Sequence, residues 1–188
     1  MTENSGQSDR EDIVALLERQ HQEIRELFAE VETAEGDRKR DAFRELVRLL
    51  AIHETAEEEV VHPAVRSAEG GDAVVDERLD EEHRAKELLS TMTDVGTEGE
   101  GFDALLRQLR TDVLAHAENE EREEFPKLRA HYDDQQLRGM AVAARAAEAM
   151  APTRPHPGVE SAKANLLLGP PVAIMDRARD AIRTALGN

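Results

Sequence analysis

Four successive segments of this sequence repeat apolar residues at the spacing of an α-helix, and none alternates for long in the manner of a strand. The segments end at glycines or near the last helical signal: near Gly36, at Gly70-Gly71, at the glycine-rich stretch 96–101, and near His131. Four amphipathic helices joined by short links are typical of an antiparallel up-down four-helix bundle. We therefore predict an all-α chain whose bundle occupies residues 11–131.

The ends of the chain differ in character from this bundle. We expect residues 1–10 to be disordered, and residues 132–188 to form a C-terminal helical extension. Within the extension, the Ala-rich stretch 135–150 favours a helix, whereas the proline-rich stretch 152–158 cannot be helical and is typical of an extended linker. Two arrangements remain open, because the extension could pack along the bundle or be mobile.

Composition and charge exclude several classes of protein. The chain has no Cys, which excludes disulfides, thiolate metal sites and a cysteine nucleophile. With 24 basic and 41 acidic residues its formal charge is −17, which repels phosphate backbones, so we expect no nucleic-acid partner. No apolar run is long enough for a membrane span, and the first residues lack the basic and apolar regions of a signal peptide. We expect a cytoplasmic protein with no membrane partner.

A pattern of His, Glu and Pro occurs twice in the chain. His53 is followed by Glu57 at +4 and by Pro at +10, and His116 is followed by Glu120 and by Pro at the same spacings. The two copies are 63 residues apart, and His21 and His83 are 62 residues apart. The sequence therefore predicts a duplicated helix pair, with one His on the first helix of each pair and His-x-x-x-Glu on the second.

Helical rotation predicts which of these groups face the core. A +4 spacing is a net rotation of roughly 40°, so Glu57 shares a face with His53, and both lie within the apolar stripe of their helix. The same holds for His116 and Glu120. His62, at +9 from His53, is half a turn away, and we assign it to the surface.

Four imidazoles and two carboxylates in a bundle core require compensation, because an unpaired buried carboxylate costs several kcal/mol. Bound cations remove that cost by making these groups ligands. Imidazole and carboxylate without sulfur suit iron, manganese or zinc, and six protein ligands suit two metals, with the glutamates placed to bridge them. The alternative for any single buried histidine is an ordinary hydrogen-bonded core residue. The candidate ligands are His21, His53, Glu57, His83, His116 and Glu120.

At these residues the sequence resembles the hemerythrin-like family, the HHE cation-binding domain, over residues 11–131. The family motif is one His on helix one, His-x-x-x-Glu on helix two, His on helix three and His-x-x-x-Glu on helix four. The resemblance implies a four-helix bundle that encloses two iron ions in an oxo- or hydroxo-bridged non-haem diiron centre.

One departure from the oxygen-carrying members concerns helix three, where those proteins have two histidines spaced by four. Here the residue four after His83 is Glu87. Glu87 is an additional candidate ligand or an outer hydrogen-bond acceptor, and a plain surface glutamate is the alternative. An iron site with less imidazole and more oxygen favours reaction with peroxide or oxygen over reversible oxygen carriage.

Two functions follow as expectations. The first is a diiron protein that binds or reacts with a small oxidant, namely O₂, peroxide or NO, with peroxide consumption as the enzymatic possibility, since no organic-substrate site is visible. The second is a non-catalytic iron or oxygen sensor, or a metal buffer, in which the C-terminal extension responds to metal loading.

Overall fold

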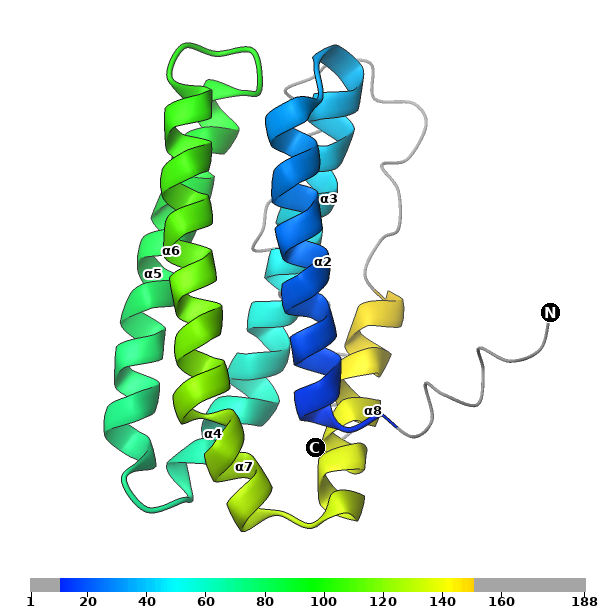
Figure 1. Ribbon diagram of the computed structural model, residues 1–188, viewed down its shortest axis with the longest axis vertical. Coiled ribbons are helices and arrows are strands. Elements are labelled where there is room, and N and C mark those ends of the chain that lie inside the picture. Colours follow the sequence, from blue (N-terminus) through cyan, green and yellow to red (C-terminus); the bar gives the residue numbers. More distant parts are fainter. Residues whose placement is uncertain (1–10, 151–188) are drawn as a thin grey trace, which may run out of the picture.

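The computed structural model describes residues 11–150, and these form a bundle of antiparallel helices (Figure 1). The first helix, α2 (Ile13–Thr33), begins at Asp12, whose carboxylate accepts a hydrogen bond from the backbone N–H of Ala15. It is followed by α3 (Gly36–Ala56), α5 (Gly71–Val95) and α6 (Phe102–Glu123). The predicted all-α four-helix bundle is therefore confirmed.

Two of the four long helical segments are interrupted near their C-terminal ends. After α3 the chain forms a π-helical turn, η1 (Glu57–Val61), and then the short helix α4 (His62–Arg66). After α6 it continues as α7 (Phe125–His131). A proline lies at the second residue of both α4 and α7, where its missing N–H is tolerated. The first interruption begins at Glu57, the glutamate of the first His-x-x-x-Glu pattern, and the second lies just beyond the second pattern.

The core consists of two apolar clusters with a polar layer between them. The loop-side core lies towards the α2–α3 and α5–α6 loops, and the tail-side core lies towards α8 (Asp134–Met150). Along α2, Leu17 belongs to the tail-side core and Ile24 to the loop-side core, with His21 between them. The loop-side core includes Ile24, Phe28, Phe43, Leu46, Leu50, Leu89, Met92, Phe102, Leu106 and Leu109. The tail-side core includes Ile13, Leu16, Leu17, Val60, Val61, Val65, Phe125, Leu128, Leu137, Ala141 and Ala144.

The part of the predicted extension that the structure describes packs on the bundle. Leu137 and Ala141 of α8 are buried in the tail-side core with Ile13 of α2, and Arg145 pairs with Glu11 across this contact at 2.6 Å. The predicted disordered residues 1–10, the proline-rich linker and the rest of the extension lie outside the described residues. Within residues 11–150, no helix is both long enough and apolar enough to cross a membrane.

Candidate metal centre

Two histidines from neighbouring helices meet in the polar layer. The Nε2 atoms of His21 on α2 and His53 on α3 lie 3.1 Å apart, and both side chains are almost completely buried. His53 Nε2 also lies 2.9 Å from Glu57 Oε1, and His21 Nε2 lies 3.2 Å from Glu120 Oε2. The Nε2 atoms of the two imidazoles and the oxygens of the two carboxylates thus point into the same small space.

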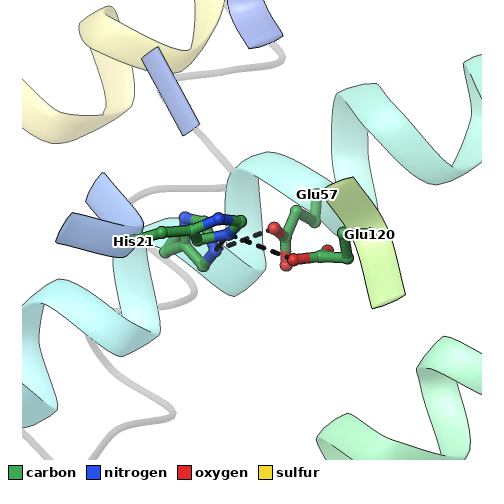
Figure 2. Close-up of side chains that lie close together, drawn as sticks. His21, Glu57 and Glu120 are labelled. Carbon is green, nitrogen blue, oxygen red and sulfur yellow. Dashed lines mark hydrogen bonds and ion pairs between the residues drawn. The ribbon is translucent and has the colours of Figure 1, made fainter. Parts of the chain in front are cut away.

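Glu57 and Glu120 face each other across the bundle from η1 and α6, both with no exposed surface. Figure 2 shows the imidazole of His21 opposite these two carboxylates. On their other side lies His116, whose Nε2 is 3.8 Å from Glu57 Oε2 and 3.4 Å from Glu120 Oε1. Each carboxylate therefore lies between one imidazole on the α2–α3 side and His116 on the α5–α6 side.

The outer nitrogen of each of these three histidines has a partner. The Nδ1 atoms of His21, His53 and His116 lie 2.8, 2.9 and 2.9 Å from oxygens of Glu121, Gln20 and Glu81, respectively. An acceptor at Nδ1 holds the proton there and leaves Nε2 free to bind a cation, which is the arrangement that metal-ligating histidines have.

Several inner atoms of the site make no hydrogen bond. Both carboxylate oxygens of Glu57, Oε1 of Glu120 and Nε2 of His116 are buried without a hydrogen bond. Buried polar groups in native proteins nearly always have partners, and leaving one unpaired costs about 1–3 kcal/mol, more for a charged group. Because the orphaned atoms converge, and the donor set of nitrogen and carboxylate oxygen suits iron, manganese or zinc, the residues present fit a metal centre.

The structure does not place His83 in this cluster, and the prediction that it faces the core is wrong. Its side chain is 74% exposed, and so is most of Glu87, which lies 3.5 Å from it on the surface. Glu82 is buried instead. The inward face of α5 follows a regular spacing of three and four, formed by Val75, Arg78, Glu82, Ala85, Leu89 and Met92. His83 is rotated by roughly 100° from that face. The apolar spacing of α5 therefore indicates that His83 points outward, whereas its spacing from His21 along the chain does not report which way it faces.

The assignment of His62 to the surface is also wrong, since only 3% of it is exposed. The π-turn η1 inserts one extra residue between His53 and His62. The +9 spacing therefore acts as +8 in a regular helix, a net rotation of roughly 80° instead of 180°. Glu124, one turn beyond Glu120, is likewise completely buried.

These residues form three groups, and within each group the donor atoms lie within 4.8 Å of one another. Five of the six predicted ligands take part, His83 does not, and Glu82, His62 and Glu124 are added. The groups are His21 with His53, Glu57 and Glu120; Glu57 with Glu82 and His116; and His62 with Glu120 and Glu124.

Burial and mutual repulsion raise the pKa values of the added carboxyls. Burial and the neighbouring Glu57 and Glu54 raise the pKa of Glu82 to about 9, and burial with Glu120 and Glu57 raises the pKa of Glu124 to about 8. Burial would also raise the pKa of Glu57, but His53 and His116 outweigh it and hold that pKa well below its usual range. A metal-free site is therefore protonated in part, and binding of cations must release these protons.

A half-buried lysine flanks the site on the α3–α5 side. The ammonium of Lys86 lies 3.2 Å from Glu82 Oε2, 2.7 Å from Glu58 Oε1 and 3.5 Å from Glu54 Oε2. Burial raises the pKa of Glu54 to about 7, against the opposing effect of Lys86. This pairing fixes the outer oxygen of Glu82 and leaves Oε1 directed at the interior.

A small cavity adjoins the centre on its loop side. It is lined by the three histidines of the centre, by Glu54, Glu81 and Glu82, and by an apolar wall that includes Ile24, Leu50, Ala85 and Val113. A space with metal-ligating groups on one side and apolar side chains on the other can admit a small neutral molecule while limiting water.

Comparisons with known proteins agree with this fold. The family model of the hemerythrin HHE cation-binding domain matches residues 12–128. A protein named DNA nickase from Nostoc sp. (strain PCC 7120 / SAG 25.82 / UTEX 2576) is 30% identical over 145 residues, which cover 75% of this chain and 41% of the relative, so this chain spans less than half of that protein. A crystal structure of a hemerythrin HHE cation-binding domain-containing protein from Mycobacterium kansasii has a similar fold, with a TM-score of 0.65 and 18% identity, and covers 93% of this chain and 99% of that one.

Proposed function

This chain belongs to the hemerythrin HHE cation-binding family, and on that premise we propose that its His/Glu centre holds two iron ions that react with a small oxidant, namely O₂, peroxide or NO. The observation that carries this proposal is the convergence of buried imidazole nitrogens and carboxylate oxygens from four helices, several of them without a hydrogen bond. Manganese or zinc would fit the same donors, since nitrogen and oxygen ligands do not select strongly among these metals. A cytoplasmic location is part of the proposal.

The two metal positions would have unequal ligands. His21 and His53 would hold the first ion, and His116 and Glu82 the second, while Glu57 and Glu120 are shared. The second position is therefore richer in oxygen and carries more negative charge. Anionic oxygen ligands stabilise a more highly charged cation, so this position favours oxidised iron. We infer that the site consumes oxidant, preferably peroxide or oxygen, instead of releasing it unchanged.

The iron pair would supply the redox change and the Lewis acidity. The chain's own residues orient and shield that pair. Gln20, Glu81 and Glu121 hold the three imidazoles by Nδ1, and the apolar wall of the cavity limits water at the reacting face. Lys86, paired with Glu82 and Glu54, places an ammonium beside the oxygen-rich position, where it balances negative charge.

Anaerobic loading with ferrous iron, followed by peroxide or oxygen, tests the proposal. We expect at least two tightly bound iron ions per chain, a visible ferric absorption after oxidant is added, and measurable loss of peroxide. His53→Ala should abolish the absorption, whereas His83→Ala, which changes an exposed histidine, should not. Full iron loading without any spectral response or loss of oxidant would contradict the proposed reactivity.

A sensor or metal-buffer function is the second candidate, and the packing of α8 is the observation that favours it. Leu137 and Ala141 of α8 contact the tail-side core beside α2, the helix that carries His21. A change at the metal could therefore be transmitted to this contact. Limited proteolysis of metal-free and iron-loaded protein distinguishes the two functions, because identical cleavage within residues 132–188 in both states would argue against sensing.

DNA nicking is no part of the proposed function. That activity is named for a relative of which the chain spans only a part. The formal charge of −17 opposes contact with a phosphate backbone.

A further inference from the structure

Two facing columns of donor groups continue beyond the metal pair. On α6 and its end, His116, Glu120 and Glu124 follow one another at +4, and each step advances about 6 Å along the bundle. The opposite column consists of His53, Glu57 and His62, with the extra residue absorbed by η1. We call His62 and Glu124 the third rung, because they lie one step beyond the level of Glu57 and Glu120.

The third rung is buried and has no hydrogen-bond partners. His62 is 3% exposed and Glu124 is 0% exposed. Both ring nitrogens of His62 and both carboxylate oxygens of Glu124 make no hydrogen bond. The three histidines of the centre each have an acceptor at Nδ1, so His62 differs from them in having none there.

The geometry of the rung matches the size of a cation site. His62 Nε2 lies 3.9 Å from Glu124 Oε2 and 3.4 Å from Glu82 Oε1. The donor atoms of His62, Glu120 and Glu124 all lie within 4.8 Å of one another. An ion with bonds of about 2.1 Å holds opposite donors about 4.2 Å apart and neighbouring donors closer than that, so donors at these distances can share one ion.

Without a cation, this part of the core is difficult to explain. A direct hydrogen bond between His62 and Glu124 is excluded at 3.9 Å. Each unpaired buried group costs on the order of 1–3 kcal/mol, and a charged one costs more. A cation would satisfy an imidazole nitrogen and a carboxylate oxygen at once.

We propose that the third rung, together with the shared carboxylate of Glu120, binds a third divalent cation beside the metal pair. The donors, one imidazole and two carboxylates with Glu82 adjacent, suit a first-row ion such as Fe²⁺, Mn²⁺ or Zn²⁺. The helix interruptions create the site, because η1 turns His62 inward and Glu124 occupies the break before α7. The proposed oxidant chemistry requires only the pair, so this inference goes beyond it.

Metal stoichiometry of the full chain tests the third position. Wild type, His62→Gln, Glu124→Gln and the control His83→Gln are equilibrated anaerobically with Fe²⁺, and bound iron is measured by elemental analysis, with circular dichroism as the check of folding. We expect three ions per chain for wild type and the control, and two for the His62 and Glu124 variants. In crystals of wild type equilibrated with Mn²⁺, anomalous scattering should show an ion within about 2.5 Å of His62 Nε2.

Two results would overturn the third position. Two ions in wild type and in every variant, with no anomalous peak beside His62, would show that the rung holds no cation. Loss of an ion of the pair from folded His62→Gln or Glu124→Gln would assign these residues to the pair instead. A failure of the proposed oxidant chemistry gives a different result. In that case iron binds at His53 and His116, but its spectrum does not respond to oxidant.

Discussion

At the scale of single residues, the partners of the outer histidine nitrogens explain how the ligands are held. Glu81 accepts from His116 Nδ1 and also contacts Arg78 and Asn119, so its carboxylate is itself fixed. It orients the imidazole and makes its Nε2 more basic. The strength of metal binding should therefore depend on a residue that does not touch the metal.

We predict that Glu81→Gln weakens metal affinity by about 10–100-fold without unfolding the protein. Competition with a chromophoric chelator measures the affinity. Glu77→Gln is the matched control, because Glu77 is an exposed carboxylate one turn earlier on α5. Equal affinities for the two variants would show that Glu81 does not position His116.

The raised pKa values of Glu82, about 9, and Glu124, about 8, make the stability of the metal-free protein depend on pH. Both lie above the ordinary value of 4.5, so the folded state binds more protons than the unfolded state between these limits. The contribution of these two protonated carboxyls to the free energy of unfolding is complete below pH 4.5, and it is lost as the pH rises to about 9.

We therefore predict that the free energy of unfolding of the metal-free protein falls between pH 6.5 and about 9, while metal affinity rises over the same range. Urea unfolding at a series of pH values checks the first trend. The double variant Glu82→Gln/Glu124→Gln should flatten it. A wild-type stability that increased towards pH 9 would have the wrong sign for buried, protonated carboxyls.

At the scale of helices, the +4 spacing predicted which groups share a face of one helix. His53, Glu57, His116 and Glu120 are brought together as the +4 spacing indicated. His62 was misplaced because a π-turn cannot be recognised from apolar spacing, and every residue beyond it is rotated. His83 was misplaced for another reason. The prediction was based on its spacing from His21 along the chain, whereas the inward face of α5 contains Glu82 instead.

The π-turn leads to a prediction about chain length. Deletion of the half-buried Glu59 should convert η1 to a regular α-helix and leave His62 facing inward at +8, so the variant should fold and bind metal. Deletion of Arg48 within α3 should rotate His53 by roughly 100° relative to the preceding turns and abolish metal binding. Metal analysis and circular dichroism of both variants test this, and loss of metal from the Glu59 deletion alone would contradict the account of η1.

At the scale of the whole molecule, the polar layer is held between two apolar cores that can be perturbed separately. Phe102 and Phe43 pack edge to face at 5.0 Å in the loop-side core, near the end of the bundle away from α8. We predict that Phe102→Ala destabilises the protein by about 3–5 kcal/mol in urea unfolding. Iron bound per folded chain should not change. A coupled loss of iron under folding conditions would show that the two regions are not independent.

We expect bound metal ions to stabilise the buried His/Glu layer of the whole molecule. A ligand that binds only the folded state raises stability, by about 4 kcal/mol at a thousand times its dissociation constant. The most direct measurement is the melting temperature of iron-loaded protein before and after a strong chelator, for wild type and for His53→Ala. We predict that the chelator lowers the melting temperature of wild type and leaves that of His53→Ala unchanged, whereas equal melting temperatures of wild type with and without chelator would contradict a metal-stabilised core.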